Sequence, residues 1–439
     1  MTDLTTDVGC RLAESDRSVV LCFQMDEPSE VKYPDLAWVV PLAITVMVGF
    51  GVILYGFSVY TTDQAAGAEF SKTVLSVAYG GAVFVGGLLA LPVGRFADRH
   101  GVRLIVGAGA LFGCLGLVGF SIANEPWQVI TAWWLLLGPA QAMIYYEPAY
   151  VAIDQWSSSP RDRSRTLATI TLIGGFAGIV FIPATARLVT VLDWRPTVAL
   201  LGLLLLVVGG ATSLFALPPW RNHQTKTGDT SVSTGLTKTL LRDRRFLLYT
   251  VALILILLST QGIIAHRLAR FEETGFSLTT VSLWAAVASA MSLPGRWMAP
   301  RLAERFGATR VQAIIALIVA SSVLLMVDGT TSWQMIGHFF LFGLAFGALF
   351  PLRAMVMGAW YSGPTYGRVM GTQWTGVVLI AATGPVLVGV LRDTMGSYAL
   401  SFGVLTVFFL MAAAVILASG RVDQNDRSTD SQVMPDAGV

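Results

Sequence analysis

Three charged side chains stand inside long apolar stretches of this 439-residue chain: Glu147, Arg296 and Arg353. A guanidinium keeps its charge at any ordinary pH and can grip a carboxylate through two parallel hydrogen bonds. A carboxyl group in apolar surroundings can carry a proton, or it can stay ionised beside a cation. The three residues therefore indicate binding of an anion, transfer of a proton, or both.

The setting of these residues predicts a membrane protein. Hydrophobic residues make up 54% of the chain and charged residues 13%, against roughly 25% charged residues in soluble domains. A soluble chain could not bury so much apolar surface. Apolar runs of about 20 residues, enough to cross the hydrocarbon core of a bilayer, recur along the chain. The twelve expected spans are 36–60, 72–96, 103–123, 127–153, 164–188, 194–217, 245–269, 277–302, 308–328, 332–358, 365–391 and 396–419.

A polar break at the centre of the chain divides the spans six and six. It covers residues 218–243 and is expected to be a cytoplasmic linker. The sequence thus predicts an N-terminal six-helix bundle over 36–217 and a C-terminal six-helix bundle over 244–419. The polar tails, 1–35 and 420–439, are expected to be disordered and cytoplasmic.

The distribution of Lys and Arg predicts the orientation. Most of these residues lie in one set of loops, and such loops face the cytoplasm. We therefore expect both termini in the cytoplasm and a multi-pass protein of the cell (plasma or inner) membrane. The loops concerned hold Arg95–Arg103, Arg161–Arg165, Arg221–Arg245, Arg301–Arg310 and Arg368.

The two halves also repeat one another at an offset of 206 residues. Trp127-Gln128 falls on Trp333-Gln334, and a charged loop in each half matches as well. Two copies of a six-helix unit in the same orientation imply a two-fold axis along the membrane normal, with a central cavity between the halves. The matched loop residues are Arg95, Ala97, Asp98, Arg99 and Gly101 with Arg301, Ala303, Glu304, Arg305 and Gly307.

Glu147 and Arg353 occupy equivalent positions of this repeat. Each lies about six residues, or about 9 Å of helix, from the expected cytoplasmic end of its span, as does Arg296. Charges inside a bilayer are costly and tend to be functional. We expect Glu147 and Arg353 to approach each other and to act in coupling or gating. Two alternatives remain open: Glu147 carries a proton alone, or the pair only joins helices.

The loop between the second and third spans carries a family resemblance. It reads Gly94-Arg95-Phe96-Ala97-Asp98-Arg99-His100-Gly101-Val102-Arg103 and is similar to G-x-x-x-D-R-x-G-x-R, the signature of the major facilitator superfamily. Arg301–Gly307 is a weaker copy. The resemblance covers residues 36–419 and implies an all-α membrane protein with twelve transmembrane helices in two pseudo-symmetric bundles. Two such halves around a central cavity can rock for alternating access, and we expect a functional monomer.

Within that superfamily the chain resembles the monocarboxylate-porter and oxalate–formate-antiporter branch. The segments that carry this likeness are YGFSVY, YGGAVFVGG, GPAQAMIYYEP, Asp193-Trp194-Arg195 and AHRLARFEETGFS. Two features depart from it: Phe57–Tyr60 lacks the lysine of animal members, and Ser292 replaces an acidic residue one turn before Arg296.

The branch resemblance implies Arg296 as the anchor of an anionic substrate and His266 as a second substrate contact. The alternatives are an arginine that extends to the inner interface and a histidine at the outer interface beside Arg267. Tyr55, Tyr145 and Gln261 are candidate hydrogen-bond donors in the cavity, although such residues also pack helices together.

The signature loop suggests a conformational latch. Asp98, Arg95, Arg99 and Arg103 can pair with one another and with the C-terminal ends of neighbouring helices, where cations are favoured. Such a cluster can hold one state closed and release it in another. The alternative is a charge cluster that only determines orientation.

Catalytic and cofactor motifs are not apparent. The three cysteines show no CxxC spacing, and we find no nucleotide-binding, zinc-protease or nucleophile-elbow motif. We therefore expect no enzyme, cofactor, metal site or nucleic-acid partner. The leading hypothesis is a secondary active transporter that moves a small organic anion, a carboxylate, by proton coupling or exchange. A drug or metabolite exporter of the same fold and a non-transporting membrane sensor are the alternatives.

Overall fold

The computed structural model of the chain describes residues 36–156, 160–218, 239–361 and 366–432. Every regular element in these ranges is a helix. The expected N-terminal tail, most of the expected linker and the end of the expected C-terminal tail lie outside the described residues.

The first half runs from Leu36 to Ala216. Its elements are α1 (Leu36–Gly49), η1 (Phe50–Tyr55), α2 (Gly56–Tyr60), η2 (Ala66–Ala68), α3 (Lys72–His100), α4 (Val102–Ser121), α5 (Pro126–Ala132), η3 (Trp133–Leu137), α6 (Gly138–Ile144), α7 (Tyr146–Trp156), α8 (Pro160–Gly175), α9 (Ala177–Leu192), α10 (Trp194–Ala211) and η4 (Thr212–Ala216). Elements η1, η3 and η4 are π-helical, whereas η2 is a 3₁₀ turn.

The second half has longer, less interrupted helices. They are α12 (Arg244–Glu273), α13 (Leu278–Phe306), α14 (Ala308–Asp328), α15 (Ser332–Trp360), α16 (Tyr366–Ala381), α17 (Thr383–Met395) and α18 (Ala399–Gln432). Two of them pass their predicted ends: α12 continues beyond residue 269, and the backbone of α18 stays helical past residue 419, where a disordered tail was expected.

Eleven helical segments in the described ranges are long and apolar enough to cross a membrane. They match eleven of the twelve predicted spans. The remaining span, predicted over 127–153, is a chain of short helices from Pro126 to Trp156. It runs through the first half beside α3 and α4. The prediction of twelve membrane-crossing segments is confirmed, but that of one continuous fourth helix is wrong.

The interruption lies at Tyr145, whose backbone is extended (φ −70°, ψ −154°). Its cause is three residues further on. Pro148 has no N–H to donate to the carbonyl of Ile144, and its ring would clash with that carbonyl in a continuous helix. The chain therefore ends α6 at Ile144 and restarts at Tyr146, which places Glu147 in the first turn of α7.

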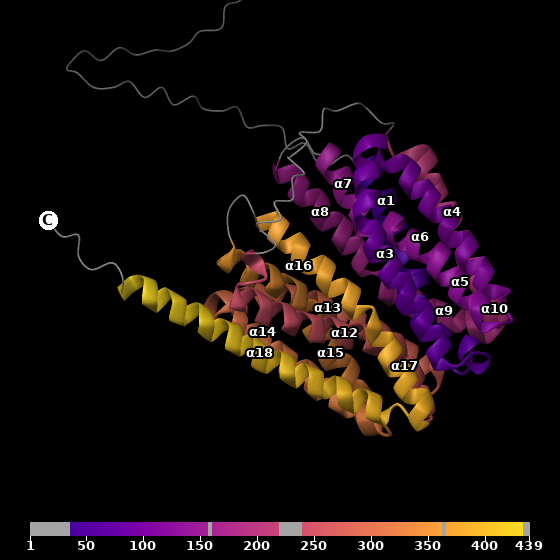
Figure 1. Cartoon of the computed structure of the whole chain (residues 1–439). Coiled ribbons are helices and arrows are strands. Elements are labelled where there is room, and N and C mark those ends of the chain that lie inside the picture. The colour runs from indigo at the N-terminus through magenta and orange to yellow at the C-terminus, as the bar shows by residue number, and fades with distance from the viewer. Residues whose placement is uncertain (1–35, 157–159, 219–238, 362–365, 433–439) are drawn as a thin grey trace, which may run out of the picture. The chain divides into compact units, whose positions relative to one another are not determined.

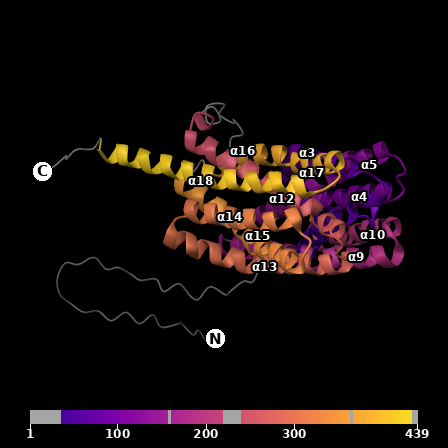
Figure 2. The same cartoon turned by 90° about the horizontal axis from the view of Figure 1, so that it is seen from below.

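The two halves have matching internal contacts. Helix α4 packs on α10 in the first half, and α14 packs on α18 in the second. Between the halves, α3 lies beside α17 and α9 packs on α13 (Figures 1 and 2). Each pair of contacts follows the 206-residue repeat, so the predicted pair of related six-helix bundles is confirmed.

Local geometry repeats as well. Gly101 and Gly307, one in each charged loop, both adopt φ of 86°, a conformation that side chains with a Cβ rarely take. The fifth and eleventh spans are both interrupted, at Phe176 and at Ala382. These positions again differ by 206 residues. The repeat thus extends from the matched glycines to helix breaks at Phe176 and Ala382, which no match of residue types reveals.

Close contact within the second half depends on small residues. Gly343 and Gly347 on α15 face the backbone of α13 at Ala288 and Ser292, and a Cβ at either glycine would overlap that backbone. This spacing of small residues lets helix backbones approach closely in a membrane. Ser292, which departs from the family pattern, is thus part of a tight helix contact.

Replacing Gly347 with alanine is expected to destabilise the protein by about 1–3 kcal/mol, as overpacking of a filled interior does. The matched control is Gly210→Ala, because a Cβ at Gly210 meets nothing within 4 Å. Thermal unfolding of both variants in detergent checks the prediction. A Gly347 variant that melts with the control would show that α13 and α15 can separate without penalty.

Candidate functional site

The signature loop marks one end of the bundles, which we call the Arg-rich end; it holds the loops Arg95–Arg103 and Arg301–Arg310. The two halves meet firmly at the opposite end. Thr61 Oγ1 donates to Ala265 O at 2.9 Å. The backbone N–H of Asp63 donates to Glu272 Oε2 at 2.6 Å. These hydrogen bonds join α2 and its following loop to α12.

A second contact at the opposite end joins α3 to α17 and α12. The backbone N–H of Thr73 donates to Asp393 Oδ2 at 2.7 Å. Ser76 Oγ and His266 Nε2 lie 2.8 Å apart, and His266 Nδ1 lies 3.1 Å from the hydroxyl of Tyr398. His266 is fully buried. The structure therefore places this histidine in the contact that closes the opposite end, not on an open cavity surface.

The Arg-rich end is different. Helices α7 and α8 make their main contacts with α1, α3, α4, α6 and α9 of their own half. The Glu147 side chain, at the start of α7, is exposed. Within the described ranges, the hydrogen bonds that join the halves therefore lie at the opposite end, whereas α7 and α8 at the Arg-rich end pack mainly within their own half.

Glu147 and Arg353 form no ion pair in this conformation, as far as the described residues show. Arg353 Nε donates to Gln373 Oε1 at 3.2 Å, and its Nη2 donates to Met370 O at 3.0 Å. Its guanidinium lies 4.5 Å from the ring centre of Trp374. The pairing was expected for the state in which the Arg-rich end is closed, so it stays a prediction.

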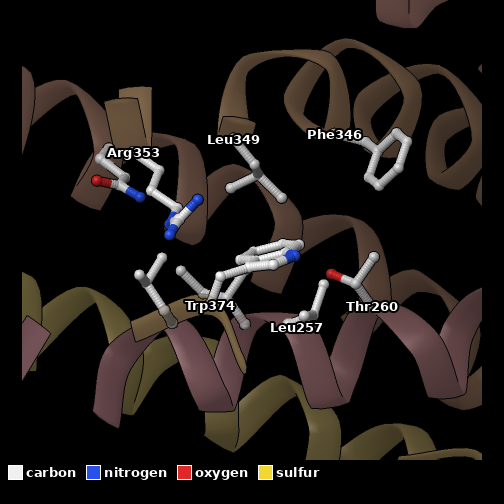
Figure 3. Close-up of a pocket in the computed structure, with 9 residues that line it drawn as sticks. Leu257, Thr260, Phe346, Leu349, Arg353 and Trp374 are labelled. Carbon is white, nitrogen blue, oxygen red and sulfur yellow. The ribbon is translucent and has the colours of Figure 1, made fainter. Parts of the chain in front are cut away.

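Arg353 also borders a pocket inside the second half. Figure 3 shows the Trp374 ring between Arg353 and Thr260, with Leu349 and Leu257 on either side of it. Helices α12, α14, α15 and α16 line this mostly apolar pocket. The guanidinium is therefore held by its own half in this conformation, and it must leave these contacts to reach Glu147.

Aromatic side chains line the region between the broken fourth span and the first. The rings of Phe50 and Tyr145 stack at 3.9 Å, and Tyr146 lies 5.0 Å from Phe50. The hydroxyl of Tyr145 is enclosed and has no hydrogen-bond partner in the described part of the chain. The π-helix η1, a feature often found at functional sites, carries Phe50 at its start and Tyr55 at its end.

Tyr55 lies where the halves face each other. A ring carbon of Tyr55 and the side chain of Ser289 on α13 both lie against the position that a Cβ on Gly178 of α9 would occupy. Gln261 on α12 lies within hydrogen-bonding reach of Tyr79 on α3. Predicted donors from both halves are thus brought into one region.

Arg296 lies on α13 between Pro294 and Pro300. Each proline leaves a carbonyl of the helix without its usual donor, and for Pro300 that carbonyl belongs to Arg296 itself. The side chain is half-buried, and its charge acts on the hydroxyls of Tyr55 and Tyr146. Over the described ranges it has neither a carboxylate nor a hydrogen-bond acceptor within reach. Such a group can bind an anion that enters between the halves.

Arg267 is a site residue that the sequence analysis overlooked. The predicted seventh span ended at residue 269, which put Arg267 at an interface, but α12 continues to Glu273. The side chain is only 2% exposed, and its charge, like that of Arg296, acts on the Tyr55 hydroxyl. A basic residue so close to His266 in an apolar run was the available indication.

The signature loop is partly described. Arg103 Nη2 donates to Leu214 O at 2.7 Å, and Ser213 Oγ donates to Arg103 O at 2.8 Å. Arg103 therefore caps the C-terminal end of the sixth span, as cations favour. Arg95 and Arg99 are exposed, and the Asp98 side chain lies outside the described residues.

Comparison with known proteins identifies the family to which this chain belongs. The family model of the Major Facilitator Superfamily matches residues 39–267 and 262–434. The MFS-type transporter pynF of Aspergillus niger is 26% identical over 309 residues, 68% of this chain and 67% of that protein. The multidrug resistance protein MdtH of Sodalis glossinidius is 24% identical over 348 residues, 77% and 81% of the two chains. Monocarboxylate transporter 13 of Bos taurus is 25% identical over 337 residues, which cover 74% of this chain and 76% of that protein.

Solved structures agree on the fold. The crystal structure of the nucleoside transporter NupG superposes with a TM-score of 0.69 over 87% of this chain and 98% of that one, at 14% sequence identity. At that identity the likeness concerns the arrangement of helices alone.

Proposed function

Because this chain belongs to the Major Facilitator Superfamily, we propose that it is a secondary active transporter that carries a small organic anion of the carboxylate class. The observation that carries this proposal is Arg296. Its half-buried guanidinium acts electrostatically on Tyr55 and Tyr146, and it lacks an acidic partner within the described residues. A guanidinium without an acidic partner in partly apolar surroundings favours an anionic ligand, and the carboxylate of a substrate can accept two parallel hydrogen bonds from it.

The proposed transport cycle uses the two ends of the bundles in turn. The loops at the Arg-rich end carry the excess of positive charge, so we assign this end and both termini to the cytoplasm of a plasma or inner membrane. The conformation described above is then inward-facing. The bundles 36–217 and 244–419 rock against each other as a monomer. The exposed Glu147 is the site for a coupled proton, unless the carrier works by exchange.

One alternative has an observation in its favour. MdtH carries the name of a multidrug resistance protein, and an exporter of drugs or metabolites would use the same fold. Exported drugs that are cationic would be repelled by Arg296 and Arg267. A preference for anionic over cationic and neutral substrates would therefore favour the anion carrier over the exporter.

A binding assay tests the proposal. Purified protein is titrated with a panel of mono- and dicarboxylates and, separately, with lipophilic cations, and the melting temperature is followed. We expect at least one carboxylate to raise the melting temperature through mass action on the folded state. Stabilisation by the cations alone would contradict the assignment.

The Asp98→Asn variant tests the latch. If the signature loop stabilises one state of the cycle, the variant should bind substrate within about twofold of the wild type but transport it at least about tenfold more slowly. Calorimetry and uptake rate, measured on the same preparation, separate binding from turnover. The matched control is Glu304→Gln in the weaker copy of the loop. If the Asp98 variant transports at the wild-type rate, the loop is not a latch, and its charges only determine the orientation of the protein in the membrane.

A further inference from the structure

A hollow lies on the surface of α3 at the Arg-rich end. It has a volume of about 210 Å³ and is lined by Pro92, Arg95, Phe96, Arg99 and His100. The rings of Phe96 and His100 stack on each other with their centres 4.2 Å apart. This hollow, which we call the α3 hollow, therefore combines two guanidinium groups with a pair of stacked rings.

The two arginines of the α3 hollow hold charges that the described protein does not compensate. Arg95 and Arg99 are exposed and stand four residues apart, on the same side of the helix. Over the described ranges, neither guanidinium has a hydrogen-bond acceptor or an acidic partner. Like charges at this spacing repel each other. An anionic group held between them would remove the repulsion and accept hydrogen bonds from both.

This side of α3 faces away from the rest of the protein. Val93 and Ala97 are buried in the core of the first half. Because a helix turns by about 100° per residue, Arg95 lies about 160° around the helix from both. Gly87 faces the second half, since a Cβ there would meet Leu379 of α16, and it lies about 80° from Arg95. The α3 hollow therefore opens toward the surrounding membrane and not toward the space between the halves.

An apolar stripe continues from the α3 hollow into the membrane. Phe84, Leu88 and Leu91 are exposed, and steps of three or four residues place them in line with Arg95 on one side of the helix. From Phe84 to Arg95 the helix rises by about 16 Å, close to one half of the hydrocarbon core, which is about 30 Å thick. The surface thus offers one leaflet's length of apolar contact, followed by two positive charges at the depth of the headgroups.

The second half lacks this arrangement at the equivalent positions. Arg301 and Arg305 of α13 match the two arginines of the α3 hollow in the 206-residue repeat. Arg301 donates to Trp297 O at 2.8 Å and lies 3.8 Å from the centre of that ring, and the Arg305 guanidinium lies 5.2 Å from the ring centre of Phe306. In the first half, Leu91 stands where Trp297 would be. The arginines of α13 are therefore engaged by their own helix, whereas those of α3 are available to a ligand.

We propose that the α3 hollow binds the headgroup of an anionic phospholipid, with the phosphate between Arg95 and Arg99 and an acyl chain along Phe84, Leu88 and Leu91. Basic pockets at the membrane surface bind such headgroups. A zwitterionic phospholipid has the same phosphate but adds a cation, which the two arginines repel. A soluble phosphate gains nothing from the apolar stripe. This lipid site is separate from the substrate and from the residues proposed to bind it.

The test is a titration of the full-length protein in detergent with phosphatidylglycerol and, separately, with phosphatidylcholine of the same acyl chains. Native mass spectrometry counts the bound lipid. We expect the wild type to bind phosphatidylglycerol at least about fivefold more tightly, and this preference should weaken as salt screens the charges. In the double variant Arg95→Gln with Arg99→Gln, the preference should fall to about twofold or less.

The matched control is Arg301→Gln with Arg305→Gln, which removes the same charge from the equivalent helix and should keep the full preference. Thermal unfolding establishes that each variant is folded. Arg95→Lys with Arg99→Lys, which keeps the charge and should keep most of the preference, serves if the glutamine variant is not folded. Equal binding of the two lipids, or equal losses in the two glutamine variants, would overturn the proposal. Displacement of the lipid by glycerol 3-phosphate at comparable concentration would show a site for soluble phosphate and would overturn it as well. None of these results would touch the proposed function, because substrate transport does not enter the assay.

Discussion

Arg296→Lys is expected to fold like the wild type and to bind its anionic substrate about 10- to 100-fold more weakly. Lysine keeps the positive charge but offers a single ammonium group in place of the planar fork that holds a carboxylate through two hydrogen bonds. Arg296 has no described protein partner, so the substitution breaks no contact on which the fold depends. The loss should therefore appear in affinity for the substrate and not in the melting temperature of the substrate-free protein.

The control for this variant is Arg301→Lys, which makes the same chemical change on the same helix. Arg301 is exposed, donates to Trp297 O at 2.8 Å and stacks on the Trp297 ring. Calorimetric titration of both variants gives the comparison. Equal affinity in the two would mean that Arg296 extends to the interface and does not hold the substrate.

The second large effect concerns Glu147 and Arg353, which we expect to pair when the Arg-rich end closes. In that state Glu147→Arg or Arg353→Glu brings like charges together. Two like charges about 4 Å apart repel by about 4 kcal/mol in partly buried surroundings, so each single variant should lose at least about tenfold in transport rate. The double variant, Glu147→Arg with Arg353→Glu, restores opposite charges and should recover part of the activity.

The neutral double variant, Glu147→Gln with Arg353→Gln, is the control for the loss of charge itself. It should be less damaging than either reversal, because an unpaired buried charge is worse than none. Uptake rates in vesicles provide the measurement. Harmless single reversals, or a swap no better than the worse single variant, would leave Glu147 as a proton site acting alone.

The membrane topology was accessible from the sequence because it follows from apolar length. Each apolar run of about 20 residues became a spanning segment, and the 206-residue repeat predicted which helices would be equivalent. Interruptions inside spans were harder to predict. The break at Tyr145 arises from Pro148, yet Pro41, Pro92, Pro183 and Pro351 lie inside helices that continue. Whether a proline breaks a helix depends on the neighbouring helices that satisfy the freed carbonyl, and those neighbours are known only from the fold.

The site residues also divide into those that the sequence could predict and those whose surroundings depend on the fold. Arg296 could be identified from the sequence because a charged side chain inside a membrane span has a high free-energy cost whichever way it is oriented. His266 was expected on the cavity surface, but its position within the closed contact depends on Ser76 and Tyr398, which are far away in sequence. Arg267 was missed because a four-residue error in the end of α12 separates an interfacial arginine from an enclosed one. Sequence patterns predict the depth of a residue in the membrane to within about one helical turn. For Arg267, an error of one turn is enough to change an enclosed side chain into an interfacial one.

The most direct test of the account is uptake by the wild-type protein reconstituted into proteoliposomes. Radiolabelled mono- and dicarboxylates are offered with and without an inward pH gradient, and empty liposomes serve as the control. We expect saturable uptake of at least one carboxylate, competed by other carboxylates and lost in Arg296→Lys. Uptake restricted to cations or neutral compounds, and unaffected by that substitution, would contradict the anion-transport account.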